Sequence, residues 1–153
     1  MIMNTIADTI EKTIVINAPQ DRVYRAVTDS AEFGSWFCNG VTGDFEIGEQ
    51  PVIHEDKYGN FRLAIIAKDP ITYFAYRWVS GTAFIPKGFE DDPLGHPNTL
   101  VEFFFEEAEG GTRVTVKESG FASLPDSYAA QNLEDNTGGW EYQLNALNEY
   151  LAK

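Results

Sequence analysis

The end of the chain carries an apolar stripe that constrains the fold more than any other feature. Its members are separated by seven, four, three and four residues, which is the spacing of one face of an amphipathic helix. They are Leu133, Trp140, Leu144, Leu147 and Leu151. The stripe predicts a long helix over about residues 125–152. Such a helix must bury its apolar face against another layer of the protein.

Strand patterns ahead of this helix indicate the layer that it covers. Residues 10–17 alternate as a strand does. A helix is predicted from Pro19 to about Thr28, and a second short helix is predicted to end near Phe37. Further strands are predicted at 44–47, 52–55, 61–68, 71–79, 99–106 and 112–119. Short turns between consecutive strands imply an antiparallel sheet. We therefore predict an α+β fold, in which about seven strands surround the long helix.

Composition narrows the function classes. The 153 residues fit one domain, and the 11 Phe, 7 Tyr and 3 Trp suit a core that contains a pocket. The formal net charge of −13 repels phosphate backbones and anionic lipid, which argues against nucleic-acid and membrane partners. Residues 1–13 lack the basic and apolar regions of a signal peptide.

Cys38 is the only cysteine, so an intrachain disulfide is impossible and a reducing, cytoplasmic location is expected.

Short segments spread over nearly the whole chain match one superfamily in their order. They are 14–19, Phe33 with Trp36, 69–70, Trp78, 99–103, 111–114, 119–121, 139–140 and 150–151. With these segments the sequence resembles the START-like, birch-pollen-allergen-like (SRPBCC) superfamily. Within it, the sequence is similar to the bacterial branch related to the C-terminal domain of the heat-shock protein 90 ATPase activator. The resemblance implies a helix-grip fold, whose sheet and long helix enclose a hydrophobic cavity. It implies no particular reaction.

Five aromatic side chains are predicted to line that cavity. Trp36 and Phe37 give the second short helix an aromatic face, and Trp78 and Trp140 point to the interior by their patterns. Phe103 lies in the strand 99–106. We interpret these rings as a wall that contacts a hydrophobic ligand. Core packing is the alternative, because the core and the cavity of this fold occupy the same place.

Glu118 is the first polar candidate for the site. Val114, Val116 and Glu118 share one face of a strand by the period of two, so the carboxyl group faces inward if the valines do. A buried carboxyl group has a raised pKa and could serve as an acid or as a polar anchor for a ligand. The alternative is a salt bridge or a cap near the start of the long helix.

His54 is the second polar candidate, because it follows the apolar pair 52–53 and could point into the cavity as an acid or base. An ordinary strand histidine is the alternative. The only other histidine, His96, is expected at the surface. Two histidines without spaced carboxylates form no metal motif. A G-x-S-x-G nucleophile motif and a glycine-rich phosphate loop are both absent from the sequence. We therefore predict no metal, no cofactor and no assigned catalytic residue.

The long segment 80–98 breaks the strand pattern with three prolines and three glycines. Its apolar side chains Phe84, Ile85, Phe89 and Leu94 need a surface to cover. We predict that the segment forms a lid over one end of the cavity. A homodimer interface is the alternative.

The function that these observations favour is a binding module for a small apolar or amphipathic molecule, without an assigned reaction. Two alternatives stay open. A co-chaperone-like module that binds a protein partner is suggested by the name of the family. A cyclase or hydrolase would need several inward polar groups, and only His54 and Glu118 can be nominated.

Overall fold

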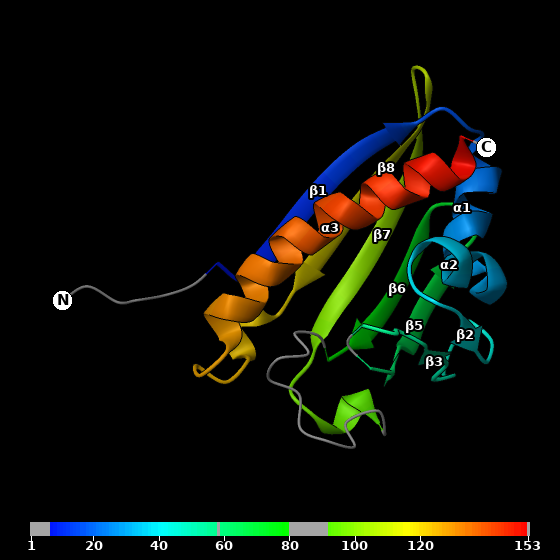
Figure 1. The fold of residues 1–153 in the computed structure, drawn as a ribbon. Coiled ribbons are helices and arrows are strands. Elements are labelled where there is room, and N and C mark those ends of the chain that lie inside the picture. The colour runs from blue at the N-terminus through cyan, green and yellow to red at the C-terminus, as the bar shows by residue number, and fades with distance from the viewer. Residues whose placement is uncertain (1–6, 58, 80–91, 153) are drawn as a thin grey trace.

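A long helix lies across one face of an antiparallel sheet in the computed structural model, which describes residues 7–57, 59–79 and 92–152 (Figure 1). The main sheet has the strand order β1-β8-β7-β6-β5. Its strands are β1 (Thr9–Ile16), β5 (Ala64–Asp69), β6 (Tyr73–Trp78), β7 (Thr99–Ala108) and β8 (Gly111–Ser119). A smaller sheet contains β2 (Val41–Thr42), β3 (Val52–Ile53) and β4 (Phe61–Arg62). The helices are α1 (Gln20–Thr28), α2 (Ser30–Trp36) and α3 (Ala129–Leu151), with 3₁₀ turns η2 (Pro93–Gly95) and η3 (Phe121–Ser123). The predicted α+β helix-grip fold is confirmed.

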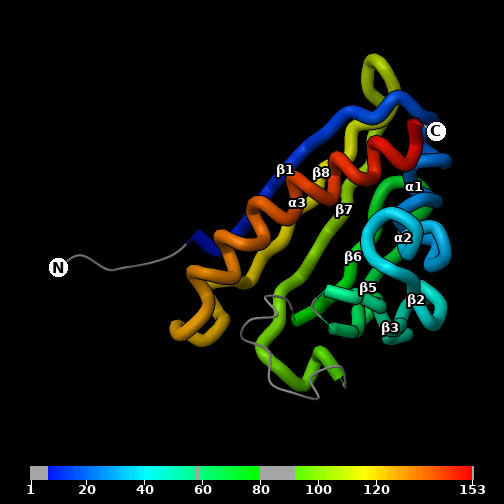
Figure 2. Tube along the Cα trace, viewed as in Figure 1, coloured from blue at the N-terminus to red at the C-terminus, as the bar shows by residue number. Residues whose placement is uncertain are grey.

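The apolar stripe of α3 faces the main sheet. Trp140, Leu144 and Leu147 are buried, and Leu133 and Leu151 near the two ends are partly buried. Figure 2 shows α3 running along β1, β8 and β7, with α1 and α2 beside its C-terminal end. The inward side chains of β6, β7 and β8 and the stripe of α3 therefore share one interior.

The β7–β8 hairpin ends in a tight turn that only glycine allows. Ala108 pairs with Gly111, and Gly110 between them has a φ of 89°. Gly111 has a φ of 138°, and a Cβ atom there would lie 2.0 Å from the carbonyl oxygen of Ile16. A side chain at Gly111 would therefore push β1 away from the turn.

The two short helices are held to the end of α3 by Glu32. The Asp29 side chain caps α2 by accepting a hydrogen bond from the Glu32 N–H at 3.0 Å. The Glu32 carboxylate accepts from Arg22 at 2.7 Å, from Arg25 at 3.1 Å and from the Tyr150 hydroxyl at 2.8 Å. These contacts join α1, α2 and α3, and Phe37 directly follows α2.

Two of the predicted strands differ from the structure. Segment 44–47 is irregular, because the backbone turns at Gly43 and Gly48, which have φ values of 110° and 90°. The predicted strand 61–68 divides at Leu63 into β4 and β5, which pair in different sheets. The described strands therefore form a sheet of five and a sheet of three, in place of one sheet of about seven.

Most of the predicted lid lies outside the described residues, including Phe84, Ile85 and Phe89. The described remainder contains η2. The Asp92 carboxylate accepts a hydrogen bond from Gln50 at 2.9 Å, and Leu94 is about half exposed. The lid and the dimer interface remain alternative predictions for this segment.

Candidate functional site

Four of the five nominated aromatic side chains meet between α3 and the main sheet. The rings of Trp78 and Trp140 have centroids 5.7 Å apart, and Phe103 meets Trp140 edge-on, also at 5.7 Å. Phe37, directly after α2, lies 6.0 Å from Trp78 and 6.1 Å from Trp140. Trp36 contacts Phe37 at 5.5 Å, but its indole N–H donates to the Ala26 carbonyl at 2.8 Å and so ties α2 to α1.

Glu118 is fully buried at the centre of this aromatic group. Its Oε1 atom accepts from the Trp140 indole at 2.8 Å and from the Asn136 amide at 3.0 Å. Its Oε2 atom accepts from the Trp78 indole at 2.8 Å and from the Thr99 hydroxyl at 2.5 Å. The carboxyl group therefore joins β6, β7 and β8 to α3. These four partners are neutral donors, and no ion pair to Glu118 is found within the described part of the chain.

Burial and hydrogen bonding act on the Glu118 carboxyl group in opposite directions. Burial raises its pKa, and the donors from Thr99, Trp140, Trp78 and Asn136 lower it by less, so the net shift is upward. The folded protein therefore holds this proton at pH values where the unfolded chain has released it.

A pH-dependent stability follows from that shift. The contribution of Glu118 is fully present below the ordinary carboxyl pKa of about 4.5, and it is lost as the pH rises through the higher pKa of the folded state. Urea unfolding of the wild type and of Glu118→Gln at several pH values measures it. We expect the stability of the wild type relative to the variant to fall as the pH rises. A difference that stays constant or grows would contradict this expectation.

The structure adds two polar groups that sequence reasoning missed. The Tyr76 hydroxyl is fully buried and has no hydrogen-bond partner among the described residues. Burial, the Glu118 carboxyl and the Cys38 thiol raise the pKa of the Tyr76 phenol well above its ordinary value. Gln143 on α3 donates through its amide to the Phe37 carbonyl at 3.1 Å, while its buried Oε1 atom has no partner in the same part of the chain. The alternation of side chains along β6 predicts that Tyr76 faces the interior. It does not predict whether the Tyr76 hydroxyl has a hydrogen-bond partner.

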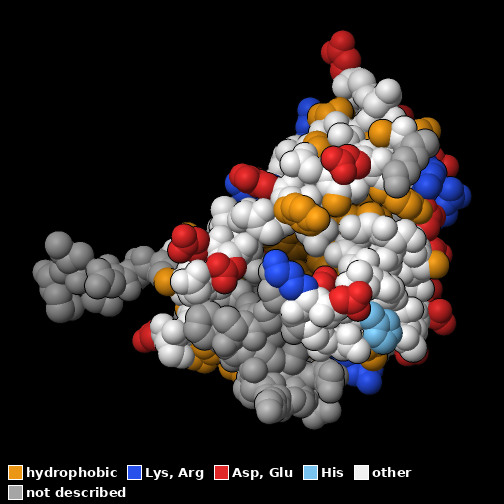
Figure 3. Space-filling view, in the orientation of Figure 1, with side chains coloured by type: hydrophobic (Ala, Val, Ile, Leu, Met, Phe, Trp, Pro, Cys, Tyr) orange, Lys and Arg blue, Asp and Glu red, His pale blue; other side chains and the backbone are white. Residues whose placement is uncertain are grey.

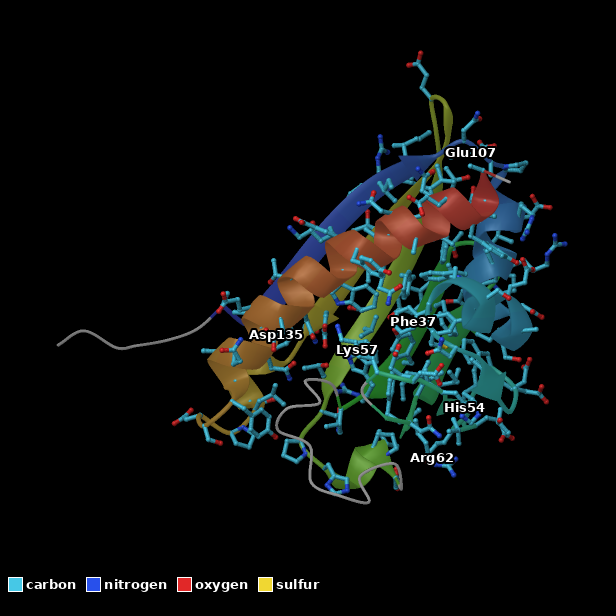
Figure 4. All side chains as sticks on the ribbon, in the orientation of Figure 1. Phe37, His54, Lys57, Arg62, Glu107 and Asp135 are labelled. Atoms are coloured by element: carbon cyan, nitrogen blue, oxygen red, sulfur yellow. The ribbon has the colours of Figure 1, made fainter. Side chains whose placement is uncertain are left out.

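His54 is not brought into this group. Its Nε2 atom lies 2.7 Å from the Thr42 hydroxyl, and the side chain is partly exposed. Figure 4 shows His54 beside β3, apart from Phe37. Because its imidazole turns toward β2, the carboxyl group of Glu118 and the ring of His54 do not form an acid–base pair.

The surface beside α3 is hollowed. Figure 3 shows a recess beside α3, with hydrophobic side chains at its base and a basic side chain at its rim. Figure 4 places Phe37 and Lys57 in this region, between α3 and the strands. A recess with an apolar base and a few buried polar groups is the usual form of a small-molecule site.

Two other kinds of site are not found in the part of the chain that the structure describes. No group of three or more His, Cys, Asp or Glu side chains is arranged to hold a metal ion there. Among the same residues, no helix is both long enough and apolar enough to cross a bilayer.

Comparisons with known proteins identify the family. Residues 17–152 match the model of the activator of Hsp90 ATPase homolog 1-like proteins, and the chain belongs to that family. The resemblance found in the sequence is therefore confirmed. The comparison with curated proteins gives no match.

Solved structures share the fold at low identity. DynU16, a protein of the dynemicin biosynthetic locus, has a TM-score of 0.74 at 21% identity over 97% of this chain, which spans only 48% of DynU16. MLL2253 of Mesorhizobium loti has a TM-score of 0.73 at 21% identity, covering 94% of this chain and 96% of that one. The Aha1 dimer of Colwellia psychrerythraea has a TM-score of 0.67 at 20% identity, covering 94% and 95%. These similarities describe the fold and leave the ligand open.

Proposed function

We propose that the protein is a binding module that takes a small apolar or amphipathic molecule into the recess beside α3. The observation that carries the proposal is the buried Tyr76 hydroxyl, which has no hydrogen-bond partner among the described residues. Buried polar groups in folded proteins are nearly always paired, with protein, water or ligand, and one without a protein partner calls for an explanation. A polar group of a bound molecule would supply the partner.

The surrounding side chains support the same proposal. Phe37, Trp78 and Trp140 offer ring faces and edges to an apolar body. Glu118 acts here as a rigid support, because its hydrogen bonds hold the two indoles in place from both oxygen atoms. No reaction is assigned to this site. A cytoplasmic location belongs to the proposal as well, and it rests on the lone Cys38.

Titration with an uncharged fluorescent dye, N-phenyl-1-naphthylamine, tests the proposal. We expect saturable binding of one dye per chain, with a rise in dye emission. Phe37→Ala removes one ring of the wall and should weaken binding about tenfold, which corresponds to about 1.4 kcal/mol. The control is Ile47→Ala, because Ile47 is 63% exposed in the segment between Gly43 and Gly48. Its affinity should equal that of the wild type.

The absence of saturable dye binding by the folded protein would overturn the proposal. Equal weakening by the two variants would also contradict it, because the effect would then not belong to the recess.

A protein-binding role is the second candidate, and the family match favours it. The family is described by the activation of the Hsp90 ATPase, and one of the similar structures is a dimer. Stimulation of an Hsp90 ATPase by this protein, without any dye binding, would support that role. Analytical ultracentrifugation of the wild type would show whether a homodimer forms.

A further inference from the structure

We propose that the site selects an uncharged ligand whose polar end both accepts and donates hydrogen bonds, such as a carboxamide, and that it rejects carboxylates. This inference rests on the proposed function and adds the chemical class of the ligand. Three observations carry it: two buried polar atoms have no partner in the described residues, one belongs to β6 and the other to α3, and the buried carboxyl group of Glu118 joins these two elements.

The first atom is the hydroxyl of Tyr76, on the sheet side of the interior. The raised pKa of this phenol keeps it protonated at neutral pH, so it presents one O–H donor and accepting lone pairs. Its ring contacts Trp78 at 5.5 Å and Phe103 at 6.3 Å, so the hydroxyl belongs to the same aromatic group. A ligand carbonyl oxygen is a suitable acceptor for the Tyr76 O–H.

The second atom is Oε1 of Gln143, on the α3 side. A backbone carbonyl only accepts hydrogen bonds, so the Phe37 carbonyl fixes the orientation of the Gln143 amide with its NH₂ group toward Phe37. The remaining Oε1 atom is a pure acceptor and requires a donor from the ligand. Gln143 contacts Phe37 directly, and the rings of Phe37 and Tyr76 both contact Trp78, at 6.0 and 5.5 Å. Both residues therefore belong to the group around Trp78, with Tyr76 on the sheet side and Gln143 on the α3 side.

The surroundings disfavour a negative charge at this place. Glu118 already uses the donors of Trp78, Trp140, Thr99 and Asn136, so they cannot receive a second carboxylate. When Glu118 is ionised, it also repels an anion beside it. A buried charge without a partner is strongly unfavourable. Lys57 is exposed, so salt in the surrounding water screens its charge from a group in the buried interior.

Three naphthalene derivatives with nearly the same shape test the inference by displacement of the bound dye. 2-Naphthamide offers an acceptor and donors, methyl 2-naphthoate offers only acceptors, and 2-naphthoate is an anion at pH 7. We expect the amide to bind most tightly. The ester should bind about fivefold to tenfold more weakly, because it leaves Gln143 Oε1 unpaired. The carboxylate should bind at least about fiftyfold more weakly.

The variant Tyr76→Phe tests whether the Tyr76 hydroxyl binds the ligand, and its melting temperature shows whether the fold is preserved. The variant removes a group without a partner in the described part of the chain, so its melting temperature should equal or exceed that of the wild type. Its affinity for 2-naphthamide should fall about tenfold. Tyr73→Phe is the matched control on the same strand, because the Tyr73 hydroxyl donates to Glu102 on the outer face of the sheet. Its affinity for the amide should be unchanged.

The outcomes separate the two proposals. If the dye does not bind, the proposed function fails. If the dye binds and the carboxylate displaces it as well as the amide does, or if none of the three displaces it, the binding module stands and this inference fails. Unchanged amide affinity in Tyr76→Phe also overturns the inference.

Discussion

Replacing Glu118 with alanine should lower the free energy of unfolding by roughly 2–6 kcal/mol, because the change leaves two buried indole N–H groups without an acceptor at about 1–3 kcal/mol each. The indoles of Trp78 and Trp140 both donate to this carboxyl group, from opposite layers of the protein. Thr99 and Asn136 lose the same acceptor. Urea unfolding followed by circular dichroism measures the loss.

Two further variants serve as controls, and they show whether the loss of stability in Glu118→Ala comes from the buried carboxyl group. Glu118→Gln keeps the shape and one acceptor oxygen, so we expect a loss of only about 1–3 kcal/mol from the donor that then faces an NH₂ group. Glu106→Ala removes an exposed carboxylate from the neighbouring strand, where it pairs with Arg113 at 2.9 Å. That surface pair should contribute less than about 1 kcal/mol. A Glu118→Ala protein as stable as the Glu106→Ala protein would show that the buried carboxyl group does not hold the interior together.

Replacing Trp140 with alanine should destabilise the protein by about 3–5 kcal/mol, the usual range for a large aromatic side chain in a core. Trp140 is only 2% exposed, and its ring contacts Phe37, Trp78 and Phe103. The alanine variant would leave a cavity between α3 and the sheet and would remove one donor to Glu118. Thermal and urea unfolding measure the effect.

Tyr142→Ala is the matched control for Trp140. Tyr142 lies two residues further along α3 and is 73% exposed, so its replacement should change the stability by no more than about 0.5 kcal/mol. The double variant of Trp140 and Glu118 should lose less than the sum of the single losses, because the two residues share a hydrogen bond. Additive losses, or a Trp140→Ala protein with wild-type stability, would contradict this account of the interior.

Patterns within single elements predicted much of this structure. The stripe on the last helix identified Trp140, Leu144 and Leu147 as buried, and alternation along β8 placed Glu118 on the same side as Val114 and Val116. These predictions are correct because the direction of a side chain follows from the local backbone geometry of its own helix or strand. Segment 44–47 was predicted wrongly, since the turns at its two ends depend on glycines that adopt positive φ.

Patterns within single elements did not predict the contacts between different helices and strands. The donors to Glu118 lie 18, 19, 22 and 40 residues away along the chain. The sequence analysis proposed both His54 and Glu118 as polar residues of the cavity. In the structure, the His54 ring instead forms a hydrogen bond with the Thr42 hydroxyl. Gln143 carried no signal at all, because a polar residue on a helix is usually a solvated one.

The sequence by itself determined the fold class, the long helix and the inward direction of Glu118, because each depends on residues that are close along the chain. Only the tertiary structure decided that two tryptophans from opposite layers donate to Glu118, and that Tyr76 and Gln143 keep buried polar atoms without partners in the described residues. The reason is physical. A hydrogen bond needs its two atoms within about 3 Å, and for segments far apart in the chain that distance is set by how the helix packs on the sheet.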